Sequence, residues 1–264
     1  MGVLTHNYDT LRVRFDDDIC FVQMHRPDSG NAINTQLIDE LGHALGACVG
    51  HAKVVVLEGL PEAFCSGADF KEIQTRVDSV DSAGGQDEQD PGPLYDLWHQ
   101  LACGPFVTIA HVRGRANAGG IGFVAACDIV LSDTKAVYSL SELLFGLMPA
   151  CVLPFLIRRV GFAKANYMTL MTQPVSATQA MEWGLVDACD DNSDNLVRKH
   201  LLRLRRLGKD GIARYKRYAG SLDDALAAAK PKALAANLEV FTDPGNLHTI
   251  ARYVRTGKFP WEAD

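Results

Sequence analysis

Apolar and polar residues alternate on both sides of an Asp-rich turn in residues 11–26, a pattern typical of a β-hairpin. Residues 34–48 place apolar side chains three and four positions apart, which predicts an amphipathic helix. Four short apolar runs predict buried strands; they start at Val54, Val107, Asp128 and Leu185. Helical patterns at residues 71–77 and 94–101 separate strands, so we expect an α/β fold with a layered core.

The pattern becomes helical throughout from about Ser193. We therefore expect residues 1–192 to form the α/β core and residues 193–264 to form a C-terminal helical region. Residues 78–93 are polar, acidic and rich in glycine, which predicts a surface segment. Such a segment serves either as a lid over a site or as an ordinary solvated loop.

Composition narrows the class of protein. The chain is 47% hydrophobic and 22% charged, as in ordinary globular proteins. A net charge of -6 argues against a general affinity for nucleic acid or for an anionic membrane. No apolar run approaches the roughly 18 residues of a membrane helix, and no secretory signal is visible, so a cytoplasmic location is expected.

The seven cysteines form no C-x-x-C pair and lie in apolar contexts. An odd number of scattered cysteines argues against a disulfide framework and against a zinc site. We expect reduced cysteines in the core, with no metal and no other cofactor.

Two stretches lead from a strand into a helix through small residues, FCSGADFKEI and NAGGIGFVAACD. The first N–H groups of a helix lack intrahelical partners, and the helix dipole places positive charge there. If both turns face one point, their N–H groups can hold an oxyanion. The alternative is that the glycines only permit tight turns and close packing.

Several stretches resemble, in order and spacing, those of the crotonase family of enoyl-CoA hydratases and isomerases: HRPDSGNAIN, FCSGAD, GRANAGGIGF, SELLFGLMP and SATQAMEWGLVD. The resemblance covers nearly the whole chain. It implies a crotonase spiral of ββα units with a C-terminal helical trimerisation region, and an oxyanion hole made by the N–H groups of Ala68 and Gly119. It also implies an acyl thioester substrate and assembly into homotrimers or hexamers.

The same resemblance implies that Glu142 is a catalytic carboxylate and that Gly122 replaces a second one, which hydratases of the family usually carry. Ser139-x-x-Glu142 also fits a capping box, so Glu142 has an alternative role at a helix start. A single carboxylate supports elimination if it takes the α-proton and returns it to the departing hydroxyl. It also supports movement of a double bond. If the one-carboxylate site is adapted to a branched tertiary alcohol, we expect the substrate's methyl or carboxymethyl branch to occupy the space that a second glutamate would fill.

Within the family, the chain most resembles the dehydratases of polyketide β-branching cassettes, through PLYDLWHQL, SLSELLFGLMPACVLPFLIRR and GKFPWE. This implies dehydration of a 3-hydroxy-3-methylglutaryl group on an acyl carrier protein to a 3-methylglutaconyl thioester. Two alternatives stay open. One is a coenzyme A-linked hydratase or isomerase of primary metabolism. The other is a non-catalytic trimeric scaffold that binds RNA or protein.

Further residues are candidates for contact with the acyl group. Tyr95 and His99 lie four positions apart on a predicted helix, and Tyr95 is equally typical of a core residue. Asn117 either binds the substrate hydroxyl or caps the helix that follows it. Asp69 follows the first turn and either caps its own helix or takes part in the site.

The distal carboxylate of such a substrate needs a cation, and spacing does not choose among Lys71, Arg76 and Arg115. Residues 198–217 carry nine Lys or Arg against one Asp. Such a run is either a solvated helix face or a docking surface for an acidic carrier protein or for the phosphates of coenzyme A.

Overall fold

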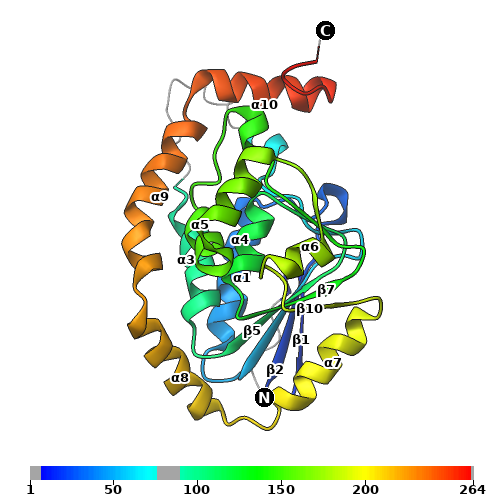
Figure 1. The fold of residues 1–264 in the computed structure, drawn as a ribbon, viewed down its shortest axis with the longest axis vertical. Helices are drawn as coiled ribbons and strands as arrows, with labels where there is room; N and C mark the ends of the chain where they lie inside the picture. The colour runs from blue at the N-terminus through cyan, green and yellow to red at the C-terminus, as the bar shows by residue number, and fades with distance from the viewer. Residues whose placement is uncertain (1–6, 76–89, 263–264) are drawn as a thin grey trace.

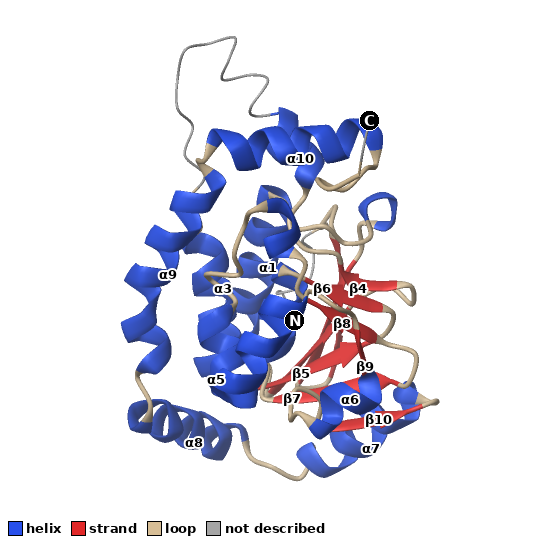
Figure 2. Ribbon diagram, turned by 45° about the horizontal axis from the view of Figure 1, so that its top comes forward, coloured by secondary structure: helices blue, strands red, loops and turns tan. Residues whose placement is uncertain are grey.

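The computed structural model describes residues 7–75 and 90–262, and it places a helical layer against two sheets (Figures 1 and 2). Its strands are β1 (Leu11–Asp16), β2 (Ile19–Met24), β3 (Val54–Glu58), β4 (Ala63–Cys65), β5 (Val107–Val112), β6 (Arg115–Asn117), β7 (Ile129–Asp133), β8 (Val137–Ser139), β9 (Val175–Ser176) and β10 (Ala188–Asp190). Its α-helices are α1 (Thr35–Cys48), α3 (Gly92–Cys103), α4 (Gly119–Ala126), α5 (Leu153–Met171), α6 (Ala177–Glu182), α7 (Ser193–Leu204), α8 (Lys209–Leu222), α9 (Ala225–Phe241) and α10 (Pro244–Thr256). Short 3₁₀ helices are η1 (Pro27–Ser29) and η2 (Glu142–Phe145), and residues 70–75 are also helical.

The predicted hairpin is confirmed. Strands β1 and β2 pair antiparallel, with Leu11 opposite Met24 and Asp16 opposite Ile19. Asp17 in the connecting turn has φ 53°, a left-handed conformation that Asp tolerates better than most residues. The predicted helix at residues 34–48 is also confirmed, and the Asn34 side chain caps it by accepting from the Leu37 N–H.

The larger sheet has the order β1-β2-β3-β5-β7-β10 and is parallel from β2 onward. Alternate residues of β3 face opposite layers. Val55 and Leu57 join the core beneath α1, α3, α4 and α5, whereas Val54 and Val56 pack with residues of α7. Helices thus cover both faces, which explains why the sequence of β3 is apolar without alternation.

A buried histidine fastens α7 to this sheet. His111 on β5 contacts Glu58 Oε1 through Nδ1 and Ser193 Oγ through Nε2, each at 2.9 Å. His111 is fully buried and Ser193 nearly so. Each polar atom of the imidazole therefore has a partner, as a buried ring requires.

The smaller sheet has the order β4-β6-β8-β9. Consecutive strands alternate between the sheets: β3, β5 and β7 belong to the larger one, and β4, β6 and β8, which follow them, to the smaller. A helical segment follows each pair, so the chain repeats a ββα unit. This confirms the predicted α/β class and the ββα spiral.

The C-terminal region is helical as predicted, and α8, α9 and α10 form an arc around the helical layer (Figure 1). Leu226 and Ala233 of α9 belong to the main core cluster. The last predicted strand starts at Ala188 instead of Leu185, because Leu185 lies in the turn after α6, where its N–H donates to Ala180 O. Residues 76–89, which include most of the predicted surface segment, lie outside the described part of the chain.

All seven cysteines are free thiols, as predicted, and five of them are buried. Within residues 7–75 and 90–262, no helix combines the length and apolarity needed to cross a membrane.

Candidate functional site

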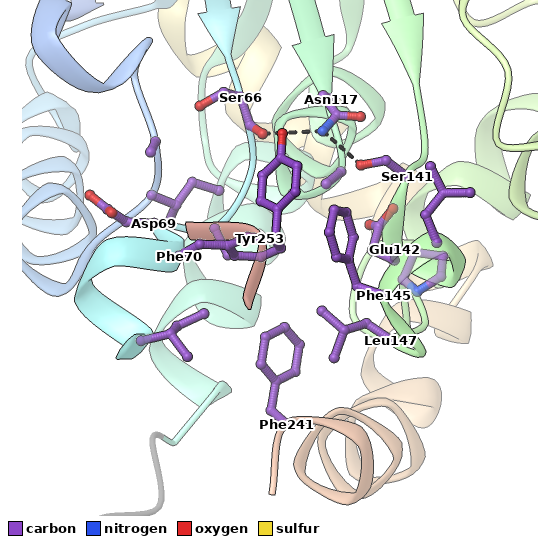
Figure 3. Close-up of a pocket in the computed structure, with 18 of the residues that line it drawn as sticks. Ser66, Asp69, Phe70, Asn117, Ser141, Glu142, Phe145, Leu147, Phe241 and Tyr253 are labelled. Carbon is purple, nitrogen blue, oxygen red and sulfur yellow. Dashed lines mark hydrogen bonds between the residues drawn. The ribbon is translucent and has the colours of Figure 1, made fainter. Parts of the chain in front are cut away.

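A cavity of about 1700 Å³ lies between the turns at the ends of the smaller sheet and the C-terminal helix α10 (Figure 3). Its walls come from residues 66–74, the turn before α4, η2, and the ends of α9 and α10. Several of the predicted site residues line it, namely Ala68, Asp69, Lys71, Arg115, Asn117, Gly119 and Glu142. The fold therefore brings together residues up to 74 positions apart in the sequence.

The two predicted backbone donors lie in adjacent turns. Ile33 N–H donates to Gly67 O at 2.7 Å, and Asp69 N–H donates to Ile33 O at 2.9 Å, so the N–H of Ala68 takes no part in this pairing. Neither Ala68 N–H nor Gly119 N–H donates to any residue of the described chain. A Cβ on Gly119 would lie 4.0 Å from Gly67 Cα, so the turns are in contact.

Unusual backbone conformations bring these turns together. Gly67 has φ +95°, and a Cβ there would lie 2.7 Å from the Cβ of Ala118, so only glycine fits. Ala118, immediately before Gly119, has φ 50° and ψ -122°, a combination that residues with a Cβ seldom adopt. Such strain is maintained only where the surroundings impose it, and it concentrates at functional sites.

Glu142 is a buried carboxyl on the cavity wall, at the first residue of η2. Burial raises its pKa to about 7, against the opposing effect of backbone hydrogen bonds at Glu142 and Ser141. Its Oε2 atom has no hydrogen-bond partner among the described residues. A carboxyl that titrates near neutral pH suits proton transfer.

The capping box does not form as the sequence suggested. Ser141, not Ser139, precedes η2, and it makes no side-chain cap. The Ser139 hydroxyl instead donates to Asn117 Oδ1 at 2.7 Å. The capping box with Ser139 is therefore absent, although backbone N–H groups at Ser141 and Glu142, at the start of η2, still act on the Glu142 carboxyl.

Asn117 ties the two halves of the site together. Its Nδ2 donates to Ser66 O at 3.2 Å and to Ser141 Oγ at 2.9 Å (Figure 3). With Oδ1 accepting from Ser139, the amide is engaged on both sides and makes no cap to α4. Asn117 holds the segment of Ser66 beside the segment of Glu142.

Asp69 acts at the start of the following helical segment, one of its two expected roles. Its Oδ1 accepts from the N–H groups of Lys71 and Glu72, at 3.2 and 3.3 Å. Its Oδ2 accepts from Arg26 Nη2 at 3.0 Å. These contacts fix the carboxylate in place beside Ala68.

Two of the three candidate cations, Lys71 and Arg115, lie exposed at the cavity and make no ion pair with the described residues. Arg76 lies outside the described residues. Arg255 of α10 also lines the cavity and is exposed, and no pattern in the sequence pointed to it. Arg255 reaches the cavity because α10 packs against η2, which is distant from it in the sequence.

Tyr95 does not line the cavity, which corrects its prediction as a catalytic residue. It is fully buried in the core, its hydroxyl donates to Leu226 O at 2.6 Å, and its ring packs against Phe155. Burial raises its pKa to about 12. The core alternative is confirmed. His99 on the same helix is half-buried and also lies away from the cavity.

Trp98 of α3 was not predicted, yet it lines the cavity beside Gly119 and Gly122. A Cβ on Gly122 would lie 2.4, 2.5 and 2.7 Å from Cζ2, Cε2 and Cη2 of the indole. The side-chain space next to Gly122 is therefore filled by Trp98. No side chain beyond glycine fits at position 122 without a shift of the indole.

Aromatic residues brought in by α10 form another wall that the sequence did not reveal. Tyr253 packs edge-on against Phe145 of η2 at 5.0 Å and against Phe70 at 6.4 Å between ring centroids. Figure 3 shows the Tyr253 hydroxyl pointing toward the Ser66 and Asn117 end of the cavity. This wall suits the apolar part of an acyl group.

A family model for enoyl-CoA hydratase/isomerase matches residues 14–264. The chain belongs to the enoyl-CoA hydratase/isomerase family. It is 56% identical over 256 residues to the bacillaene synthase dehydratase PksH of Bacillus subtilis, covering 97% of both chains.

Two solved structures of the family agree with the fold. That of PksH from Bacillus subtilis has a TM-score of 0.92 and covers 96% of this chain and 100% of its own. That of an enoyl-CoA hydratase from Mycobacterium avium subsp. paratuberculosis is 25% identical, has a TM-score of 0.81, and covers 98% of this chain and 100% of its own.

The pH dependence of turnover should follow the ionisation of Glu142. Because its pKa is raised to about 7 and a base must be ionised, kcat/KM for dehydration should rise with pH and level off above about 7. Stability should show the opposite trend. The native protein binds the extra proton, so this group's contribution falls as pH rises from about 4.5 to about 7. A kcat/KM profile flat between pH 5.5 and pH 8.5 would contradict the assignment.

Substitution of the backbone donors should slow turnover. Ala68→Pro removes an N–H that no described residue accepts and leaves both flanking hydrogen bonds to Ile33 in place. We expect a loss in kcat on the order of 10²-fold or more. Gly119→Pro should lose as much, although Ala118 before it is poorly suited to precede proline.

Ala68→Gly, which keeps the N–H, is the matched control and should retain most activity. Circular dichroism and thermal unfolding separate a lost donor from a lost fold. A folded Ala68→Pro variant with activity near that of the parent would exclude this N–H from the site.

Proposed function

We propose that the protein removes water from a 3-hydroxy-3-methylglutaryl group held as a thioester on an acyl carrier protein, giving a 3-methylglutaconyl thioester in polyketide β-branching. The family and the dehydratase relative make this chain an enzyme of the hydro-lyase class. The observation that carries the proposal is the buried carboxyl of Glu142, in the same cavity as two N–H groups, of Ala68 and Gly119, that donate to no described residue.

The N–H groups of Ala68 and Gly119 would hold the thioester oxygen as it gains negative charge. Glu142 in its carboxylate form would take the proton from C2, and the electron pair would pass into the enolate. The C3–O bond would then break. The departing oxygen would keep that bond's electrons and receive the proton from Glu142, leaving as water.

Placement of Trp98 supports one carboxylate instead of two. Trp98 fills the side-chain space at Gly122, so this position of α4 has no room for the side chain of a second acid. Elimination by one group that first accepts and then returns a proton needs no second acid. This arrangement agrees with a dehydratase better than with a water-adding enzyme that divides the work between two acids.

Lys71, Arg115 and Arg255 are the proposed partners of the distal carboxylate. All three are exposed cations at the cavity, so an anion there keeps part of its hydration. The aromatic wall of Phe145 and Tyr253 would take the apolar part of the acyl chain.

We also propose that the carrier protein docks on residues 198–217. Fewer of their Lys and Arg side chains are available for docking than the sequence suggests. Lys216 is buried in an ion pair with Asp128, and Arg205 contacts Asp16 at 2.5 Å. The exposed members that form no ion pair with the described residues are Arg198, Lys199, Arg203, Arg206, Lys209, Arg214 and Arg217. An acidic carrier would be attracted by these charges.

A homotrimer or hexamer is also proposed. Large apolar side chains are exposed on α5 and α8, among them Phe162, Leu170, Tyr215, Tyr218 and Leu222. Assembly into a trimer or hexamer would cover exposed apolar side chains of this kind. Light scattering of the purified protein distinguishes a monomer from these assemblies.

A coenzyme A-linked hydratase or isomerase is the second candidate, supported by the similarity to the mycobacterial hydratase structure. Mass spectrometry of the acyl group after incubation decides between them. Loss of one water from the carrier-bound substrate, faster than from the coenzyme A thioester, supports the proposal. Equal or faster turnover of the coenzyme A thioester favours the second candidate, and further loss of carbon dioxide would indicate a decarboxylase.

A further inference from the structure

The indole N–H of Trp98 is a hydrogen-bond donor without an acceptor. Trp98 is 1% exposed and lines the cavity, and its Nε1 has no hydrogen-bond partner among the described residues. An indole can only donate, and buried Trp N–H groups usually have an acceptor. A donor left alone at this place therefore indicates a group that arrives with the substrate.

The orientation of the indole is fixed by packing. Phe123 and Phe155 meet it edge to face, with ring centroids 5.7 and 5.8 Å away. The face of the six-membered ring lies over α4, because Cζ2, Cε2 and Cη2 are 2.4, 2.5 and 2.7 Å from the Cβ position of Gly122. Cζ2 lies 3.9 Å from the Cβ position of Gly119, whose N–H is one of the two oxyanion donors.

A complementary atom belongs to the same cavity. Glu142 Oε2 is a buried acceptor without a partner, as Trp98 Nε1 is a buried donor without one. A hydroxyl both accepts and donates, so it is the ligand group that satisfies the two together. Carbonyl oxygens and carboxylates only accept, and they would leave Glu142 unpaired.

We propose that Trp98 binds the leaving hydroxyl of the substrate through its Nε1–H. This inference rests on the proposed dehydration. As the C3–O bond breaks, the oxygen keeps the electron pair and receives the proton that Glu142 removed from C2. Trp98 keeps its own hydrogen and stabilises the negative charge that builds on the oxygen before water departs.

The distal carboxylate of the substrate is a poorer match for this donor. Trp98 is surrounded by Phe123, Phe155 and the apolar helix α4, where burial of a full negative charge is costly. The exposed Lys71 and Arg115 offer that carboxylate cations at the cavity. The geometry therefore separates the hydroxyl at Trp98 from the carboxylate at the basic side chains.

Trp98→Phe tests the proposal because it keeps an aromatic ring and removes the N–H. Two thioesters that carry the 3-hydroxyl, the 3-hydroxy-3-methylglutaryl one and its 3-hydroxy-3-methylbutyryl analogue without the distal carboxylate, should both lose about 10- to 100-fold in kcat/KM. The inhibition constant of a 3-methylglutaryl thioester, which lacks the hydroxyl, should stay within about twofold. Trp183→Phe, which changes a tryptophan outside the cavity, is the matched control.

Two results overturn the proposal. Unchanged kcat/KM in a folded Trp98→Phe variant would show that Trp98 does not bind the leaving hydroxyl. Weaker binding of the 3-methylglutaryl thioester to this variant would show that the indole N–H binds the distal carboxylate instead. A parent protein that releases no water from any hydroxylated thioester overturns the proposed function itself. The variant measurements therefore test the role of Trp98, and the parent measurement tests the proposed function, so failure of one is distinguishable from failure of the other.

A second measurement leaves Trp98 intact, in case Trp98→Phe does not fold. The chain has three tryptophans, so protein labelled with ¹⁵N at the indole gives three N–H signals, which Trp183→Phe and Trp261→Phe assign by elimination. In a Glu142→Gln background, the hydroxylated thioester should shift the Trp98 signal downfield, and the 3-methylglutaryl thioester should not. Equal shifts with both ligands would overturn the assignment.

Discussion

Glu142→Gln is expected to abolish dehydration, with a loss on the order of 10³-fold or more in kcat. The amide keeps the size and shape of the side chain but accepts no proton from C2. Glu142 is the one carboxyl with a pKa raised to about 7 among the described cavity residues. Asp69, the acid beside Ala68, is not placed to replace it, because Arg26 and two backbone N–H groups hold its carboxylate.

The fold should survive this change. Above pH 7 the parent protein has to bury an ionised carboxylate, whereas the variant buries a neutral amide. We therefore expect the midpoint of thermal unfolding of Glu142→Gln at pH 8 to be at least as high as that of the parent. Glu72→Gln, at a carboxyl in the neighbouring helical segment, is the matched control and should keep its activity. Turnover by Glu142→Gln within tenfold of the parent would refute the catalytic role.

Local patterns were sufficient to predict most elements of the core. The hairpin of β1 and β2, helix α1 and the buried strands β3, β5 and β7 each follow from apolar spacing within a single segment. The last strand was misplaced because Leu185 and Val186 are apolar and buried without belonging to a strand. Burial and strand pairing leave the same signal in a short apolar run.

The site was predictable only where one segment carries it. Ala68, Gly119 and Glu142 lie in short stretches whose order resembles the family, and all three line the cavity. The role of Asn117 was harder to predict from the sequence, because its three hydrogen bonds reach residues 22 to 51 positions away. Spacing along one segment contains no information about such partners.

Tyr95 and Trp98 illustrate the same limit on a single helix. They lie three positions apart on α3, and both are buried aromatic residues. The direction of the helix relative to α4 and α9 sends the Tyr95 hydroxyl to Leu226 and places the indole of Trp98 at the cavity. Helical periodicity identifies the buried face, but it does not say which buried residue meets the substrate.

The expectation for Gly122 needs a corresponding correction. The sequence suggested that the substrate's branch occupies the space that a glutamate would fill. The structure places the indole of Trp98 there instead, within 2.7 Å of the Cβ position. The absence of a second carboxylate is therefore explained by a side chain of the protein.

Gly122→Glu should consequently fail through packing before it affects the chemistry. Its Cβ alone would overlap three atoms of a ring that Phe123 and Phe155 hold in place. Overpacking of a buried site costs about 1–3 kcal/mol, and burying a carboxylate beside Glu142 adds to that. We expect a large drop in the midpoint of thermal unfolding, or insoluble protein, and no measurable dehydration of the branched substrate.

Gly122→Ala and Gly122→Glu combined with Trp98→Ala separate the two causes. Gly122→Ala adds only the Cβ, so it should destabilise the protein without adding charge. Removing the indole frees the space that the introduced glutamate side chain needs, so the double variant should be more stable to unfolding than Gly122→Glu. A double-mutant cycle should give an interaction energy of about 1–3 kcal/mol between the two positions. With two carboxyls then in the cavity, it should add traces of water to a linear crotonyl thioester. If Gly122→Glu alone unfolds at the parent's temperature and dehydrates the branched substrate at the parent's rate, Trp98 is not what excludes the second carboxylate.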